Sequence, residues 1–190
     1  MNIGLYFGSF NPVHVGHLII ANHVLNATDV QKIWFIVSPQ NPFKNTTTLL
    51  NEYDRLHLAK LAIENDNRIS ASDIEFKLPR PSYTIDTLAY LSEKYPDHQF
   101  SIIMGSDSYQ NLEKWKNHHL ITKNYHLYIY IRPGFGILPN IEHQVTILKA
   151  PLLEISATEI RTLVKEGKSI RYLVPENVMN EIEQNRYFKK

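Results

Sequence analysis

The chain has 190 residues, 43% of them hydrophobic, and a formal net charge of +1. This length and balance are typical of one globular domain with a sizeable core. A near-neutral charge gives no electrostatic reason to expect nucleic acid or an anionic membrane as a partner. Because the chain contains no cysteine, disulfides, thiolate catalysis and zinc–thiolate sites are excluded.

The sequence shows no targeting or membrane-spanning segment. Met1 leads almost directly into an apolar run over 3–7, without the basic and long apolar regions of a signal peptide. The apolar runs are all far shorter than the roughly 20 residues that cross a bilayer. We therefore expect a cytoplasmic protein with no membrane partner.

Short apolar runs alternate with helical patterns along the chain. We expect buried strands over 3–7, 33–37, 101–105, 127–131 and 145–149. We expect helices from near Leu18 and over 52–65, 84–95, 107–115, 157–166 and 176–185. Repeated strand–helix units predict an α/β fold, a single domain over 1–190 with a Rossmann-like open parallel sheet and helices on both faces. Its C-terminal portion, about 156–187, is expected to be helical.

The loop GSFNPVH joins the first predicted strand to the first predicted helix. In open parallel sheets, ligands bind where the carboxyl ends of strands lead into helices. Gly8 allows close approach of the backbone, and Pro12 stiffens the loop. His14 and His17 are three residues apart, so they share one face of the first helical turn.

This histidine pair predicts a phosphate site. Helix N-termini bind phosphates, and imidazole N–H groups can donate to phosphate oxygens, with added positive charge on partial protonation. A pair of packing histidines is the structural alternative. A metal pair is the third alternative, although no third ligand is visible in the sequence.

The stretch ISATEIRTLVKEG predicts a helix with a defined start. Ser156 and Glu159 have the spacing of a capping box, an apolar stripe follows over 160–164, and Gly167 marks the end. Arg161 lies in the first turns, where the helix dipole disfavours a cation, so an anionic partner is expected. An exposed arginine paired with a nearby acid is the structural alternative.

Taken together, GSFNPVHVGH and ISATEIR resemble the (H/T)xGH and ISxTxxR motifs of a nucleotidyltransferase superfamily. The stretches SPQNPFK, PSYTIDTL, GSDSYQNLEKW and IRPG are similar to those of bacterial nicotinate-nucleotide adenylyltransferases, and the resemblance runs from Ile3 to about Tyr187. That family joins nicotinic acid mononucleotide to the AMP part of ATP, giving deamido-NAD and pyrophosphate for NAD biosynthesis. The resemblance implies these two small-molecule substrates, with Mg²⁺ arriving on ATP and no dedicated protein metal site.

The resemblance also implies roles for the matching residues. It places His14, His17 and Arg161 among the catalytic groups at the ATP phosphates, with Lys44 adding charge over them. The remaining residues on the ATP side would be Gly8, Ser9, Phe10, Gly105, Asp107, Ser156 and Thr158.

On the acceptor side, the resemblance implies that Trp115 stacks on the pyridine ring. The backbone around Tyr83 and Thr84 would receive its carboxylate, with Asp107 near the ribose and Lys44 near the phosphate. Without the resemblance, Trp115 is predicted to be a core residue, Asp107 and Thr84 to open helices, and Lys44 to be a solvated loop residue.

Two positions depart from the family pattern. Many relatives carry aspartate at the position of Asn11 and histidine at the position of Phe43. Asn11 removes a charge beside the motif loop but keeps a hydrogen-bonding side chain. Phe43 removes a possible phosphate or substrate contact, so the role of the 41–44 loop is less well defined than that of the two main motifs. By composition and position, the stretch 39–50 is a candidate for a mobile lid.

The implied reaction is direct in-line attack by the mononucleotide phosphate on the α-phosphorus of ATP. A phosphate is already a nucleophile, so catalysis would come from positioning and charge neutralisation, without a covalent intermediate. The alternatives are an adenylyltransferase acting on nicotinamide mononucleotide or phosphopantetheine, and a nucleotide sensor without turnover. Assembly into a homo-oligomer is left open by the sequence.

Overall fold

The computed structural model describes residues 1–40, 48–136, 144–151 and 154–189. Lys44 and Phe43, and with them much of the proposed lid, lie outside the described residues. In chain order the elements are β1 (Asn2–Gly8), α1 (Val15–Ala27), β2 (Lys32–Val37), α2 (Glu52–Ala62), β3 (Ile69–Ser72), the 3₁₀ helix η1 (Ile74–Lys77), α3 (Thr84–Lys94), β4 (Gln99–Gly105), α4 (Ser106–Gln110), the 3₁₀ helix η2 (Leu112–Lys114), α5 (His118–Asn124), β5 (His126–Tyr130), β6 (Val145–Leu148), α6 (Ala157–Lys165) and α7 (Glu176–Gln184).

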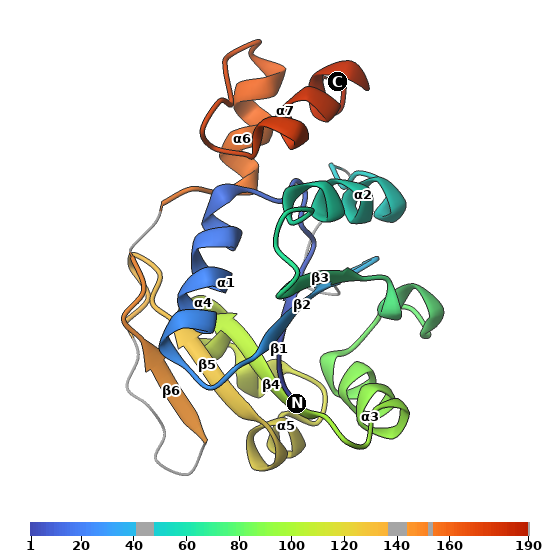
Figure 1. The fold of residues 1–190 in the computed structure, drawn as a ribbon, viewed down its shortest axis with the longest axis vertical. Coiled ribbons are helices and arrows are strands. Elements are labelled where there is room, and N and C mark those ends of the chain that lie inside the picture. The colour runs from blue at the N-terminus through green and yellow to red at the C-terminus, as the bar shows by residue number, and fades with distance from the viewer. Residues whose placement is uncertain (41–47, 137–143, 152–153, 190) are drawn as a thin grey trace.

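Six parallel strands form one sheet in the order β3-β2-β1-β4-β5-β6 (Figure 1). The chain runs outward from β1 in one direction and, after crossing over to β4, outward in the other. Sheets of this order bind ligands in the crevice at the carboxyl ends of the strands where the direction reverses. That crevice lies between the ends of β1 and β4.

The sheet separates two apolar layers. Successive side chains along a strand point to opposite faces, so Leu5 and Tyr6 of β1 belong to different layers. One layer contains Leu88 and Leu91 of α3 with Ile121 of α5. The other layer contains buried residues of α1, α2, α6 and α7. The predicted parallel sheet with helices on both faces is therefore confirmed.

Several elements differ from the sequence prediction, among them η1, which was not expected. The strand β3 is an edge strand that, among the described residues, pairs with β2 alone. Its sequence, ISAS, lacks the apolar run that predicts a strand. The short helix α5, HHLITKN, has too few turns to show a helical period. The expected helix over 107–115 is divided at Asn111, whose side chain donates to the carbonyl oxygen of Asp107 at 2.9 Å. Asparagine competes for backbone groups in this way and favours helix ends.

The C-terminal helices α6 and α7 lie beyond the first turn of α1 (Figure 1). The N–H of Val15 donates to the carbonyl oxygen of Leu173 at 2.9 Å, and the Asn177 amide donates to the carbonyl oxygen of Leu61 at 2.6 Å. These bonds tie the C-terminal segment to the start of α1 and to the end of α2. No helix in the described ranges is long and apolar enough to cross a membrane.

Candidate active site

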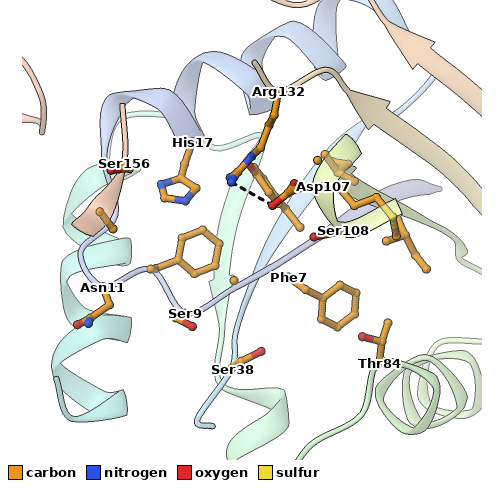
Figure 2. Close-up of a pocket in the computed structure, with 18 of the residues that line it drawn as sticks. Phe7, Ser9, Asn11, His17, Ser38, Thr84, Asp107, Ser108, Arg132 and Ser156 are labelled. Carbon is orange, nitrogen blue, oxygen red and sulfur yellow. Dashed lines mark hydrogen bonds and ion pairs between the residues drawn. The ribbon is translucent and has the colours of Figure 1, made fainter. Parts of the chain in front are cut away.

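A cavity of about 410 Å³ opens at the carboxyl edge of the sheet. Its lining includes every predicted site residue that the structure describes (Figure 2 labels several of them): Gly8, Ser9, Phe10, His14, His17, Tyr83, Thr84, Gly105, Asp107, Trp115, Ser156, Thr158 and Arg161. Lys44 lies outside the described residues. Residues from distant parts of the chain therefore meet at one site.

Phe10 fixes the loop that follows β1. Its φ is 46°, in the left-handed region, and its buried ring stacks on Phe35 at a centroid distance of 4.9 Å. A side chain at Gly8 would come within 3.0 Å of the Phe10 ring, so glycine allows this close approach. The Phe10 side chain thus anchors the loop in the core, and only its backbone remains for the predicted nucleotide contact.

Arg55 of α2, which was not predicted from the sequence as a site residue, binds the backbone of the same loop. Its side chain is 0% exposed and donates to the carbonyl oxygens of Ser9 at 2.6 Å, Ser38 at 2.7 Å and Leu50 at 2.8 Å. Burial lowers the pKa of Arg55 to about 10, so the guanidinium stays charged at neutral pH. Arg55 interrupts the apolar pattern of its helix, which was the signal in the sequence for a buried polar role.

The two predicted histidines lie against each other at the start of α1, with ring centroids 3.8 Å apart. His14 precedes the helix, and its backbone N–H donates to Nδ1 of His17 at 3.2 Å. A ring nitrogen that accepts carries no proton, so neutral His17 is protonated at Nε2. Nδ1 of His14 is buried without a hydrogen-bond partner in the described part of the chain, which favours its proton at Nε2 as well.

The sequence predicted partial protonation, and so some positive charge, on this histidine pair; for His14 that prediction is wrong. Burial, reinforced by the positive charge of Arg132, lowers the pKa of His14 to about 4. The ring is therefore neutral at pH 7 and offers a hydrogen-bond donor rather than a charge. Gly16 makes room for it, because a side chain there would lie 2.9 Å from Nδ1 of His14.

The second motif contributes the start of α6. The Ser156 hydroxyl accepts from the N–H of Glu159 at 3.2 Å, and Gly167 follows the helix with a φ of 69°, so the predicted start and stop of the helix are confirmed. Of the predicted capping box, the structure shows the bond made by Ser156. Arg161 donates to the carbonyl oxygen of Asn11 at 2.8 Å and to the Thr158 hydroxyl at 3.2 Å. The two motifs are therefore joined directly, across about 150 residues of chain.

Asn11 keeps a structural role that suits its neutral side chain. Its amide donates to the carbonyl oxygen of Thr48 at 2.9 Å, and its Oδ1 accepts from the N–H of Leu50 at 3.1 Å. A carboxylate could accept the second bond but could not donate the first. This departure from the family pattern therefore fastens the motif loop to the chain before α2.

Asp107 belongs to a polar network with Arg132, Tyr130 and Tyr6, of which only Asp107 was predicted as a site residue. Its carboxylate pairs with Arg132 at 3.2 Å, drawn as the dashed line in Figure 2. Arg132 also donates to the Tyr130 hydroxyl at 3.3 Å, which accepts from the Tyr6 hydroxyl at 3.0 Å. Burial raises the pKa of Tyr6, so this phenol stays protonated. Arg132 was not predicted as a site residue. One indication of its role was present in the sequence, because Arg132 directly follows a predicted strand, β5, and so lies at the carboxyl edge of the sheet.

The opposite end of the cavity contains Phe7 and Thr84, away from His17 (Figure 2). Tyr83 and Thr84 form the start of α3. Beneath them the buried carboxyl group of Glu75 accepts from the hydroxyls of Ser82 at 2.7 Å and Thr87 at 2.9 Å. Burial raises the pKa of Glu75, because the ionised form is poorly solvated there. Trp115 is partly buried. It packs against the apolar layer of α3 and α5, as expected of a core residue, and it also lines the cavity, as expected of a residue that stacks on a ligand.

A second cavity of about 250 Å³ adjoins the first. The residues that line both are Tyr6, His14, His17, Tyr130, Arg132, Ile155 and Ser156. Two ligands bound in these cavities would meet at a wall of imidazole, hydroxyl and guanidinium donors. Over the described ranges no cluster of three or more His, Asp or Glu side chains could hold a metal ion, so the chain's own donor set does not define a metal centre there.

The sequence matches known proteins along its whole length. A cytidylyltransferase-like family profile matches residues 5–163. A relative from Cytophaga hutchinsonii, named a probable nicotinate-nucleotide adenylyltransferase, is 53% identical over 189 residues, covering 99% of this chain and 98% of the relative. A relative of the same name from Flavobacterium psychrophilum is 48% identical over 193 residues, with full coverage of both chains.

The fold also matches a solved structure. Plasmodium falciparum nicotinic acid mononucleotide adenylyltransferase, complexed with NaAD, superposes with a TM-score of 0.84 and 21% identity, covering 98% of this chain and 97% of that chain. At this identity the match supports the fold, whereas the sequence relatives establish the family. The chain therefore belongs to the cytidylyltransferase-like family and, within it, to the nicotinate-nucleotide adenylyltransferases.

Proposed function

We propose that this protein transfers the adenylyl group of ATP to nicotinic acid mononucleotide, giving deamido-NAD and pyrophosphate. The full-length relatives carry that activity in their names. The observation that carries the proposal in the structure is the shared wall between the two cavities. A bisubstrate transfer needs two adjoining sites with anion-binding donors at their junction, and a nucleotide sensor needs only one.

The larger cavity suits the acceptor at its Tyr83 and Thr84 end. Its other end, lined by His14, His17 and Arg161, suits the ATP phosphates. The smaller cavity, which adjoins the histidine end, suits the adenosine of ATP. An oxygen of the acceptor phosphate attacks the α-phosphorus, a new P–O bond forms, and the bond from the α-phosphorus to the bridging oxygen breaks as pyrophosphate leaves. His14 and His17, through Nε2–H, donate to the α-phosphate oxygens. Arg161 and the start of α6 hold the departing β- and γ-phosphates.

The donors act by position rather than by proton transfer, because a phosphate nucleophile needs no general base. Mg²⁺ is proposed to arrive with ATP, held by phosphate oxygens and water, where it would neutralise phosphate charge. On the acceptor side, Trp115 is proposed to stack on the pyridine ring and Asp107 to bind ribose. A cytoplasmic location and one functional domain over 1–190 stay predictions.

Pyrophosphate release, measured with ATP–Mg²⁺ and one acceptor at a time, tests the function. The acceptors are nicotinic acid mononucleotide, nicotinamide mononucleotide and phosphopantetheine. We expect fast turnover with the first and much slower turnover with the others. Equal turnover with both pyridine nucleotides would remove the proposed carboxylate selectivity, and ATP binding without turnover would favour the sensor.

A further inference from the structure

The larger cavity has a cation at its acceptor end that the proposed mechanism does not use. Within the described part of the chain, three Lys or Arg side chains line this cavity: Lys116, Arg132 and Arg161. Arg132 is paired with Asp107, and Arg161 is bonded to the loop after β1. Lys116 is the member of this set that lies beside the start of α3.

Lys116 is held there by two contacts. Its Nζ lies 4.9 Å from the centre of the Tyr83 ring, and 2.8 Å and 3.0 Å from the two carboxylate oxygens of Asp86. Tyr83 precedes α3 and Asp86 lies in its first turn, so both contacts place the ammonium group next to Thr84. This is the segment that, by the family resemblance, is expected to receive the pyridine carboxylate.

The pair with Asp86 is weak enough to exchange. The side chains of Lys116 and Asp86 are 44% and 45% exposed, and exposed ion pairs contribute little to stability. Asp86 has a second source of stabilisation, because an acid in the first turn of a helix interacts favourably with the helix dipole. The ammonium group can therefore turn from Asp86 to an incoming carboxylate at small cost.

The acidic groups around the start of α3 make a cation necessary for binding a carboxylate there. These groups include Asp86 in its first turn, and the buried carboxyl group of Glu75, which is bonded to Ser82 and Thr87. A carboxylate that enters here meets the negative charge of Asp86 unless a cation accompanies it. An uncharged carboxamide meets no such repulsion and gains no such attraction.

We propose that Lys116 determines specificity for the acceptor, by leaving Asp86 to pair with the carboxylate of a carboxylated pyridine mononucleotide. This inference rests on the proposed function. It assigns to one side chain the discrimination between an acid and an amide at the same ring position. The backbone N–H groups at the start of α3 would bind either ligand, whereas the charge of Lys116 distinguishes them.

The test compares kcat and KM for nicotinic acid mononucleotide and nicotinamide mononucleotide in matched variants. Lys116→Met keeps the packing over Tyr83 and removes the charge, so we expect kcat/KM for the acid to fall about three- to fivefold through KM. Values for the amide and the KM for ATP should stay unchanged. Lys116→Arg should restore the preference, and Asp86→Asn should lower KM for the acid by freeing Lys116.

Two controls separate this role from a structural one. Lys114→Met removes a cation two residues away that bonds Asn111 and does not line the cavity, so the preference for the acid should persist. The effect of Lys116→Met should shrink as the salt concentration rises from about 0.05 to about 0.5 M.

Equal losses for acid and amide, or no change for either, would overturn the role of Lys116 alone. Absence of turnover by the unaltered protein with either acceptor would overturn the proposed function, and the role of Lys116 with it.

Discussion

The imidazoles at the start of α1 are arranged to donate hydrogen bonds in a fixed direction. The His14 backbone binds Nδ1 of His17, and Nδ1 of His14 is packed against Gly16. In their neutral forms both rings therefore have Nε2 as the donor nitrogen, which is the group that the proposed function assigns to the phosphate. Donors that are fixed before the substrate arrives require no reorganisation when negative charge develops.

The first prediction concerns His17. His17→Ala removes a donor proposed to act at the α-phosphate, so we expect kcat to fall about 100-fold or more with a modest change in the KM for ATP. His23→Ala is the matched control, because His23 lies on the same helix and does not line either cavity. Steady-state pyrophosphate release measures both, and an unchanged kcat for His17→Ala would contradict the assignment.

The second prediction follows from the pKa of His14. Its value of about 4 in the folded protein lies below the ordinary 6.5, so the unfolded chain binds this proton more readily. The contribution of His14 to stability is fully present above about pH 6.5 and is lost as the pH falls toward 4, by on the order of 3 kcal/mol. His14→Gln should lack this loss.

Urea unfolding of both proteins between pH 7 and pH 4 measures the difference. The free energies of unfolding of the two proteins should converge, or cross, as the pH falls. A constant difference across the range would show that His14 titrates normally.

At the scale of elements, α2 is the support for two loops of the site. Through Arg55 it binds carbonyl oxygens in the loop after β1 and in the chain after β2. Loop carbonyls buried without partners are costly, so one guanidinium replaces the water that would otherwise be needed. The helix thereby fixes the backbone of Ser9, which lines the cavity.

The third prediction is that Arg55→Met destabilises the protein by about 3 kcal/mol, because it leaves several buried carbonyl groups unpaired. We also expect a higher KM for ATP, since the loop after β1 loses its support. Arg68→Met is the control, because Arg68 is paired with Asp66 at the surface and should change stability by less than about 1 kcal/mol. Urea unfolding compares the two variants, and equal small changes would contradict the role of Arg55.

At the scale of the whole molecule, the C-terminal helices share a core with the sheet. Ile160 of α6 and Ile182 of α7 are buried in the same apolar cluster as Val24 of α1. The N–H of Val15 at the start of α1 is paired with Leu173 between α6 and α7. The motif at one end of the chain is therefore held in place by packing at the other end.

The fourth prediction is that the protein unfolds in one cooperative step. Tryptophan fluorescence reports Trp34 and Trp115, which pack on the α3 and α5 layer, whereas far-UV circular dichroism reports all helices. The two transitions should coincide. Ile182→Ala should lower the free energy of unfolding by about 3 kcal/mol and shift both transitions together. Separate transitions would show that the C-terminal portion unfolds independently.

The sequence by itself determined the features that depend on neighbouring residues. The apolar composition marked five of the six strands, four of them as continuous runs, because strands inside the sheet are buried on both faces and need apolar side chains throughout. The Ser156 cap and the Gly167 stop of α6 were correct because capping is local chemistry. The family motifs identified thirteen residues that line one cavity, since each motif is a short stretch read as a unit.

Only the tertiary structure decided how distant residues act on one another. Arg132 meets Asp107, Arg55 meets Ser9, and Lys116 meets Asp86 across gaps in sequence that no local pattern spans. The protonation of His14 is also a property of the fold, because burial and the nearby Arg132 set its pKa. Hydrogen bonding and desolvation depend on which groups the folded chain brings within a few ångströms, and neighbours in sequence do not specify that.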